Sequence, residues 1–150
     1  MISETSKAYA AGFIDSEGSI FIMRRSPDAD HHSPVHTLRV QAVNSYEDTL
    51  IWFYDRWGGS IHKAKKNDKG PFSTKPLWCW TVGSARALAF LEDIKPYLQE
   101  KHQKAELGIL FQQSMCYRGH VRLLDEEVIK REGFRERMLA LSRCTTVRAK

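Results

Sequence analysis

The sequence predicts an α+β domain in which two antiparallel hairpins form one sheet and helices cover one of its faces. The predicted elements follow the order αββαββα, so a helix–strand–strand unit occurs twice in succession, and further helices come after it. The strand segments alternate apolar and polar residues with a period of two. With 150 residues and 42% hydrophobic content, the chain fits one domain over residues 1–150. We expect its core at about 6–118 and a C-terminal helix and basic tail at about 120–150.

The first predicted helix ends within Tyr9–Ser19, and one of its faces is nearly bare of side chains. Ala8, Gly12 and Ser16 follow one another at four-residue spacing, so they lie on the same side of the helix. Because these residues are small, another backbone can approach this side of the helix closely.

Two carboxylates, Asp15 and Glu17, come at the C-terminal end of this helix, and Gly18 follows them. We expect Gly18 to let the chain leave the helix in a left-handed or otherwise strained conformation. The C-terminal end of a helix dipole is negative, so an acid is unfavourable there unless a cation is bound nearby. The segment therefore indicates a site for a divalent metal ion.

The first predicted hairpin runs from Ile20 to Arg25, turns over residues 26–34 and returns from about His36 to Asn44. Its return strand has one face suited to a core and one suited to a polar ligand. The first face carries Leu38, Val40 and Ala42, and the second carries Thr37, Arg39, Gln41 and Val43.

A helix over Tyr46–Trp57, with Ser45 as its N-cap, precedes the second predicted hairpin. The strands of that hairpin are Ser60–Lys66 and Leu77–Gly83. The sequence leaves open which face of Leu77–Gly83 meets a ligand, because its Trp78, Trp80 and Val82 also suit a core. Three more helices are expected, from Ser84 to about Pro96, from about Gln99 to Tyr117 and from about Asp125 to Arg143.

The formal net charge of +5 favours a polyanionic partner, and the placement of charge favours nucleic acid. Asp and Glu are absent from the segments 20–25, 38–44 and 60–66, so the open sheet face is predicted to be cationic rather than merely solvated. Side chains of this kind reach base edges as well as phosphates. The candidate DNA-binding residues are Arg24, Arg25, Thr37, Arg39, Gln41, Lys63, Lys65 and Lys66.

No membrane partner and no secretion are expected. The chain has no run of eighteen apolar residues, and its first residues lack the pattern of a secretion signal. Cys79, Cys116 and Cys144 are odd in number and far apart, so we expect reduced thiols and an intracellular protein, in the cytoplasm, nucleoid or an organelle matrix.

The chain resembles the LAGLIDADG homing endonucleases in three ordered segments. Residues 10–18 occupy the nine positions of the family signature, Leu38–Tyr46 resembles the second strand of the family, and Pro96–Ala105 resembles its Pro-aromatic-Leu-x-x-Lys-x-x-x-Ala segment. The resemblance covers about residues 8–110. It implies a curved antiparallel sheet that forms a DNA-binding saddle, with the helices on the other face.

The resemblance also implies site residues and a metal ion. Glu17 is the expected metal ligand and catalytic acid, with the backbone carbonyl of Ser16 as a second ligand, while Asn44 orders the attacking water and Lys101 lies beside the catalytic centre. The expected cofactor is Mg²⁺, for which Mn²⁺ substitutes, whereas Ca²⁺ supports binding without cleavage. No small-molecule cofactor is expected. The implied dimer interface consists of Ala8, Ala11, Gly12, Asp15 and Ser16.

The leading hypothesis is therefore a homodimeric endonuclease that makes double-strand breaks in a long, pseudo-palindromic DNA target. A homodimer is expected because the chain carries the signature once. One alternative is a catalytically silent relative that acts as an RNA maturase in intron splicing or as a DNA-binding regulator. Another is a small scaffold whose basic face meets an acidic protein. His31, His32 and His36 lack the partners typical of zinc ligands, so a structural zinc is not expected.

Overall fold

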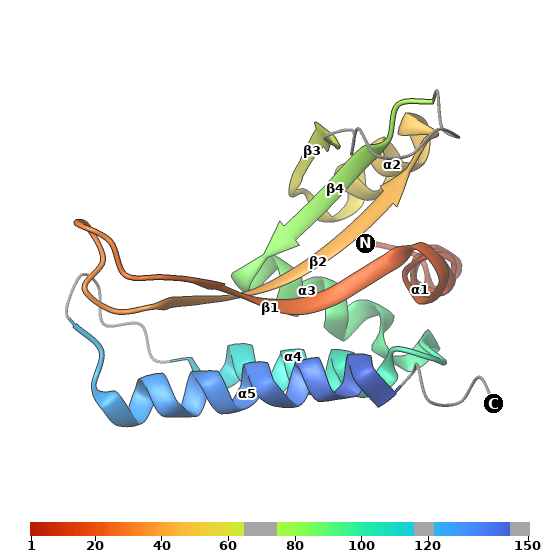
Figure 1. Cartoon of the computed structure of the whole chain (residues 1–150). Helices are drawn as coiled ribbons and strands as arrows, with labels where there is room; N and C mark the ends of the chain where they lie inside the picture. The colour runs from red at the N-terminus through yellow and green to blue at the C-terminus, as the bar shows by residue number, and fades with distance from the viewer. Residues whose placement is uncertain (65–74, 116–121, 145–150) are drawn as a thin grey trace.

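The computed structural model describes residues 1–64, 75–115 and 122–144, and it confirms the predicted α+β class. Figure 1 shows a curved sheet with a long hairpin at one end and helices packed along one side. The elements are α1 (Glu4–Glu17), β1 (Gly18–Arg25), β2 (Val35–Asn44), α2 (Glu47–Trp57), β3 (Ser60–Lys63), β4 (Trp78–Gly83), α3 (Ser84–Ile94), the 3₁₀ turn η1 (Lys95–Tyr97), α4 (His102–Ser114) and α5 (Asp125–Cys144).

The described strands form a single antiparallel sheet in the order β1-β2-β4-β3. The described strands of each predicted hairpin pair with each other, and the two pairs join through the central strands β2 and β4. Ala42 of β2 lies between Gly18 of β1 and Trp80 of β4, which fixes the register of the three strands. The sheet is therefore continuous from the end of α1 to the edge strand β3.

One face of the sheet is buried beneath the helices, as the alternation predicts. Ile20, Leu38 and Val40 are almost fully buried, and α1, α3 and α4 all pack against β2. The structure also settles the orientation of β4, because Trp80 and Val82 lie in the same core. Cys79 and Thr81 therefore point to the opposite, open face.

Several element ends differ from the sequence prediction for local reasons. Ser45 does not cap α2, because the side-chain oxygen of Asn44 accepts the N–H of Tyr46 at 2.8 Å and turns the chain one residue later. The predicted helix from Gln99 begins instead at His102, after η1. β3 ends at Lys63, and residues 65–66 of the predicted strand lie outside the described residues.

Gly18 is required for space rather than for a left-handed backbone. Its φ is −105° and its ψ is 169°, an extended conformation that other residues adopt readily. A Cβ atom at this position would lie 2.7 Å from Cδ1 and 2.8 Å from Cα of Ile14. The chain therefore passes from α1 directly into β1, and the first residue of β1 packs against Ile14 in the last turn of α1.

The helix α5 is held at the first hairpin by a polar cluster built around the buried side chain of His36. Nε of Arg24 lies 2.5 Å from the Glu132 carboxylate, and Nε2 of His36 lies 3.0 Å from the same oxygen. Burial lowers the pKa of His36 despite the raising effect of Glu132. Burial acts to raise the pKa of Glu132, but the hydrogen bonds from Arg24 and His36 outweigh it and hold that pKa below its ordinary value.

This cluster corrects the assignment of Arg24 as a DNA-binding residue. Arg24 is paired with His36 in the sheet register and shares the helix side with Ile20 and Ile22. Its guanidinium contacts α5, so it does not lie on the open face.

Among the described residues, no helix is long and apolar enough to cross a membrane.

Candidate functional site

The two acids at the end of α1 have different environments. The Asp15 carboxylate accepts the backbone N–H of Gln99 at 2.8 Å and that of Lys101 at 3.0 Å, so it holds the segment that leads into α4. Glu17 is exposed and makes no hydrogen bond or ion pair with any other described residue. Asp15 is therefore a structural acid in this chain, whereas the Glu17 carboxylate is available to a ligand.

Lys101 connects α4 to the C-terminal end of α1. Its ammonium donates to the carbonyl oxygens of Ile14 at 2.8 Å and Asp15 at 2.7 Å. An ammonium has three donors, so one N–H is left for a water or a phosphate. Burial lowers the pKa of Lys101, and the nearby carboxylates of Asp15, Glu100 and Glu17 oppose this shift. Lys101 thus balances the negative helix end while it lies close to Glu17.

Asn44 lies at the same end of the sheet as Glu17. The β1–β2 register pairs Gly18 with Ala42, so Glu17 precedes this pair and Asn44 lies two residues beyond it. The Asn44 side-chain oxygen is used by Tyr46 N–H, which leaves its amide nitrogen to donate to a water. The structure therefore brings the three predicted catalytic residues to one end of the sheet.

Within the described part of the chain, no three His, Cys, Asp or Glu side chains come together as a metal site. His31 contacts Asp28 in the first hairpin, whereas His36 contacts Glu132 on α5, so these two histidines are apart. The surroundings of Glu17 nevertheless suit Mg²⁺, which is commonly held by one or two carboxylates together with waters and substrate phosphates. The other ligands would come from water, DNA or a second chain.

The open face of the sheet carries polar and basic side chains in cross-strand rows. Directly paired residues on antiparallel strands point to the same face. None of the described strand positions on this face is Asp or Glu, so the predicted lack of carboxylates holds there. The rows are Ser19, Gln41, Thr81 and Ser60; Phe21, Arg39 and Gly83; Met23 and Thr37; Arg25 and Val35; and Val43, Cys79 and His62.

The register corrects the assignment of Lys63 to this face. Lys63 pairs with Trp78 and its ammonium lies 6.0 Å from the centre of that indole ring, on the side of the sheet that also holds Trp80. His62 occupies the open face instead, opposite Cys79. Sequence reasoning missed His62 because a short edge strand has too few residues to show its phase. Of the remaining candidates, Lys65 and Lys66 lie outside the described residues.

The two arginines of the open face, Arg25 and Arg39, differ in whether their guanidinium groups have partners within the described chain. Nη2 of Arg25 lies 2.8 Å from Nδ1 of His31 and 3.7 Å from the Asp28 carboxylate, so part of its charge is balanced within the hairpin. Arg39 has no such partner in the described chain. Thr37, Arg39 and Gln41 are half-buried side by side along β2.

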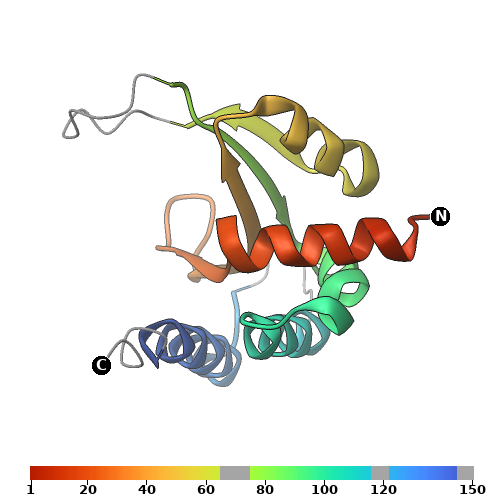
Figure 2. The ribbon, with the colours of Figure 1, turned by 90° about the vertical axis from the view of Figure 1, so that its right-hand side faces the viewer.

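The outer side of α1 is bare, as predicted from its small residues. Ala8, Gly12 and Ser16 are exposed, and a Cβ atom added at Gly12 would meet no other atom within 4 Å. The Ser16 hydroxyl is turned back onto the Gly12 and Phe13 carbonyls, so it adds little to the outer surface. Figure 2 looks onto α1, and no described element lies in front of it.

Ala11 is a correction to the predicted interface. Its exposed fraction is 0%, and it belongs to the core that α1 forms with the sheet. Position 11 follows position 8 by three residues, but the helix is rotated so that Ala10, Ala11 and Ile14 face inward. The carboxylate of Asp15 is likewise directed at the start of α4 rather than outward.

The fold is that of the LAGLIDADG homing endonucleases. The chain is similar to the homing endonuclease I-CvuI in complex with a DNA target, with 18% identity and a TM-score of 0.72 over 92% of this chain and 82% of that one. The homing endonuclease I-TnaI matches 91% of this chain and 95% of its own, with 14% identity and a TM-score of 0.62. The LAGLIDADG homing endonuclease I-SmaMI, bound to cleaved DNA, matches 86% of this chain but 42% of its own length, with 16% identity and a TM-score of 0.64. A scan against protein-family models and a search of curated proteins gave no match.

The separate environments of Asp15 and Glu17 give a stability prediction. Asp15→Ala leaves two backbone N–H groups without their acceptor, so it is expected to lower the free energy of unfolding by about 1–3 kcal/mol. Glu17→Ala removes an exposed, unpaired side chain and is expected to change it by less than about 0.5 kcal/mol. Urea unfolding at one protein concentration measures both. Equal losses in the two variants would contradict the assignment of Asp15 as the structural acid.

Proposed function

We propose that this chain, which has the LAGLIDADG homing endonuclease fold, is a metal-dependent DNA endonuclease that works as a homodimer and cuts both strands of a long, nearly symmetric site. The observation that carries the proposal is the position of Glu17. Its unpaired carboxylate lies at the junction of a bare helix face with a cationic sheet face, beside Lys101. The DNA complexes of I-CvuI and I-SmaMI, which share the fold, support the choice of DNA as substrate.

A homodimer accounts for the stripe of small, exposed residues on the outer side of α1. A stripe of small, exposed residues lets a second α1 approach closely, and a twofold axis along this contact would bring the two Glu17 carboxylates together. Two helix C-termini and two carboxylates in one place make a strongly negative pocket. A divalent cation is the group that stabilises such a pocket, and Asp15 contributes by holding α4 in position.

Hydrolysis then follows from the groups around Glu17. Bound Mg²⁺ supplies a Lewis acid that activates water and stabilises charge on the phosphate. Lys101 directs its remaining N–H and its positive charge at the scissile phosphate, and the amide nitrogen of Asn44 orients the attacking water. Because Lys101 is held by two carbonyls of α1, its position relative to Glu17 is set before DNA arrives.

The open sheet face is the proposed DNA surface. Arg39 and Gln41 carry the side-chain types that pair with base edges in the major groove, and Thr37 and Arg25 suit either bases or phosphates. A four-stranded curved sheet follows the groove over a long stretch, which accounts for a long target. In a homodimer the two sheets would read the two halves of the site in opposite directions.

The cleavage role of Glu17 is tested with Glu17→Gln, which keeps the size of the side chain but removes its charge. The variant is expected to cut a target selected with the parent protein roughly 100-fold more slowly or worse, yet to bind the same duplex in Ca²⁺. Glu136→Gln, an exposed acid on α5, serves as the control. Parent-like cutting by the Glu17 variant would refute its role. A parent protein that binds duplex but never nicks it would instead favour the silent maturase or regulator.

The homodimer is tested at Gly12. Gly12→Leu places a large side chain in the proposed contact twice, once from each protomer, and is expected to weaken dimerisation by about thirtyfold or more. Gly133→Leu is a matched control, because Gly133 on α5 is also an exposed helical glycine with no atom near its added Cβ. Sedimentation equilibrium measures both variants. An unchanged dimer in Gly12→Leu, or an equal loss in the control, would argue against this interface.

A further inference from the structure

A hollow of about 340 Å³ lies where β4 ends and α3 begins, on the open side of the sheet. Its floor is formed by the paired strands β2 and β4, and its side by the start of β3. The polar residues that line it come from the four elements β2, β3, β4 and α3: Thr37, Arg39, Ser60, Thr81, Ser84 and Arg86.

The lining is suited to an anion. Two arginines and four hydroxyl-bearing residues line the hollow, and none of its described lining residues is Asp or Glu. Arg39 comes from the middle of β2 and Arg86 from the first turn of α3. The Arg86 guanidinium carbon lies 3.7 Å from the Cβ position of Gly58, and Cγ of Arg39 lies 3.9 Å from that of Gly83. An anion in the hollow would offset the repulsion between the two positive charges that line it.

Arg39 and Arg86 also differ from the other arginines of the sheet and its surroundings. Arg24 is paired with Glu132, and Arg25 contacts His31 and Asp28. By contrast, neither Arg39 nor Arg86 makes a hydrogen bond or an ion pair with any residue that the structure describes. Their planar groups therefore keep the donors that bind phosphate oxygens in pairs.

We propose that this hollow binds a backbone phosphate of the DNA duplex, and that Arg86 anchors the duplex without reading its sequence. The inference rests on the proposed function. Arg39 lies five residues before Asn44 in β2, so the phosphate would be about 17 Å from the catalytic end of the sheet. At that distance it would set the register of the duplex on the sheet rather than take part in cleavage.

The test is the salt dependence of binding to a duplex of arbitrary sequence, measured by fluorescence anisotropy in Ca²⁺ over a series of KCl concentrations. Arg86→Ala is expected to reduce the slope of log K against log salt by about 0.9 per protomer, and to weaken affinity at low salt about tenfold per protomer. The same change is expected for duplexes of different sequence. Arg86→Lys, which keeps the charge, should retain most of the slope.

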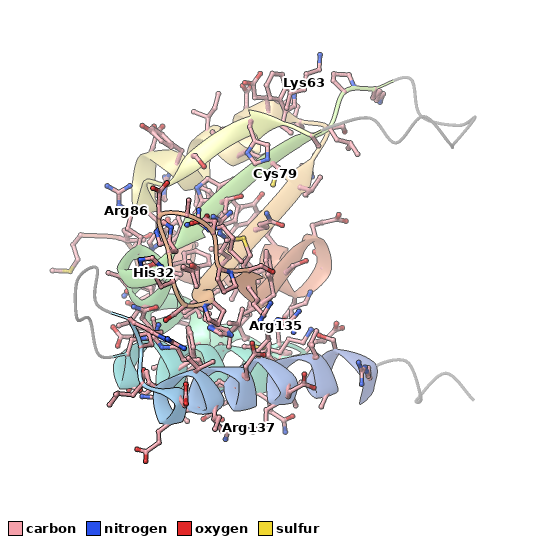
Figure 3. The ribbon with its side chains drawn as sticks, turned by 60° about the vertical axis from the view of Figure 1, so that its left-hand side comes forward. His32, Lys63, Cys79, Arg86, Arg135 and Arg137 are labelled. Atoms are coloured by element: carbon pink, nitrogen blue, oxygen red, sulfur yellow. The ribbon has the colours of Figure 1, made fainter. Side chains whose placement is uncertain are left out.

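Arg137→Ala is the matched control. Arg137 stacks on Phe134 at 4.4 Å, and in Figure 3 it projects from the far side of α5, whereas Arg86 lies beside the sheet. This control removes the same charge from the helix layer, so its slope should equal that of the parent. Equal slopes for the parent and for a folded Arg86→Ala would overturn the phosphate anchor while leaving the proposed function intact. A parent that binds no duplex would overturn the proposed function itself.

A free anion is distinguished by an NMR titration of the parent with inorganic phosphate in the absence of DNA. Duplex that displaces the bound phosphate, together with the reduced slope in Arg86→Ala, supports the proposal. Phosphate binding that is lost in Arg86→Ala while the DNA slope is unchanged would assign the hollow to a free anion and contradict the proposal.

Discussion

The contact between Lys101 and the last turn of α1 is the interaction on which the rest of the site depends. It runs in both directions, because the Lys101 ammonium binds the Ile14 and Asp15 carbonyls while the Asp15 carboxylate accepts the Lys101 N–H. The negative end of α1 is thereby balanced from inside the protein. Since Lys101 balances the helix end and Asp15 holds the segment before α4, Glu17 is left without a structural partner and stays open to a ligand.

The same junction explains why the two functional faces meet. Because Gly18 has no side chain, β1 packs directly against the last turn of α1 and begins where that helix ends. The bare side of α1 and the open side of the sheet therefore adjoin at this junction. A dimer formed through α1 would therefore bring two cationic sheet faces together with the acids between them. The sheet order β1-β2-β4-β3 extends each face outward from this centre, and the hollow between Arg39 and Arg86 lies well along it.

Much of this arrangement could be predicted from the sequence where a pattern repeats. The alternation along β2 is ten residues long, so its two faces were predicted correctly, and the spacing of Ala8, Gly12 and Ser16 identified the bare side of α1. Errors fall where a residue lies at an end or is held by a distant partner. Lys63 is the last residue of a four-residue strand, and Arg24, next to the end of β1, lies on the helix side, where Glu132, 108 positions away, pairs with its guanidinium.

In the proposed mechanism, two copies of this chain cut DNA at a site with matching halves. It is tested most directly by incubating the protein with a library of randomised duplexes in Mg²⁺ and sequencing both ends of each break. If two copies act together, the breaks are expected to be paired on the two strands, within a long consensus whose halves are inverted repeats. A consensus without that symmetry, or a library left uncut, would contradict it.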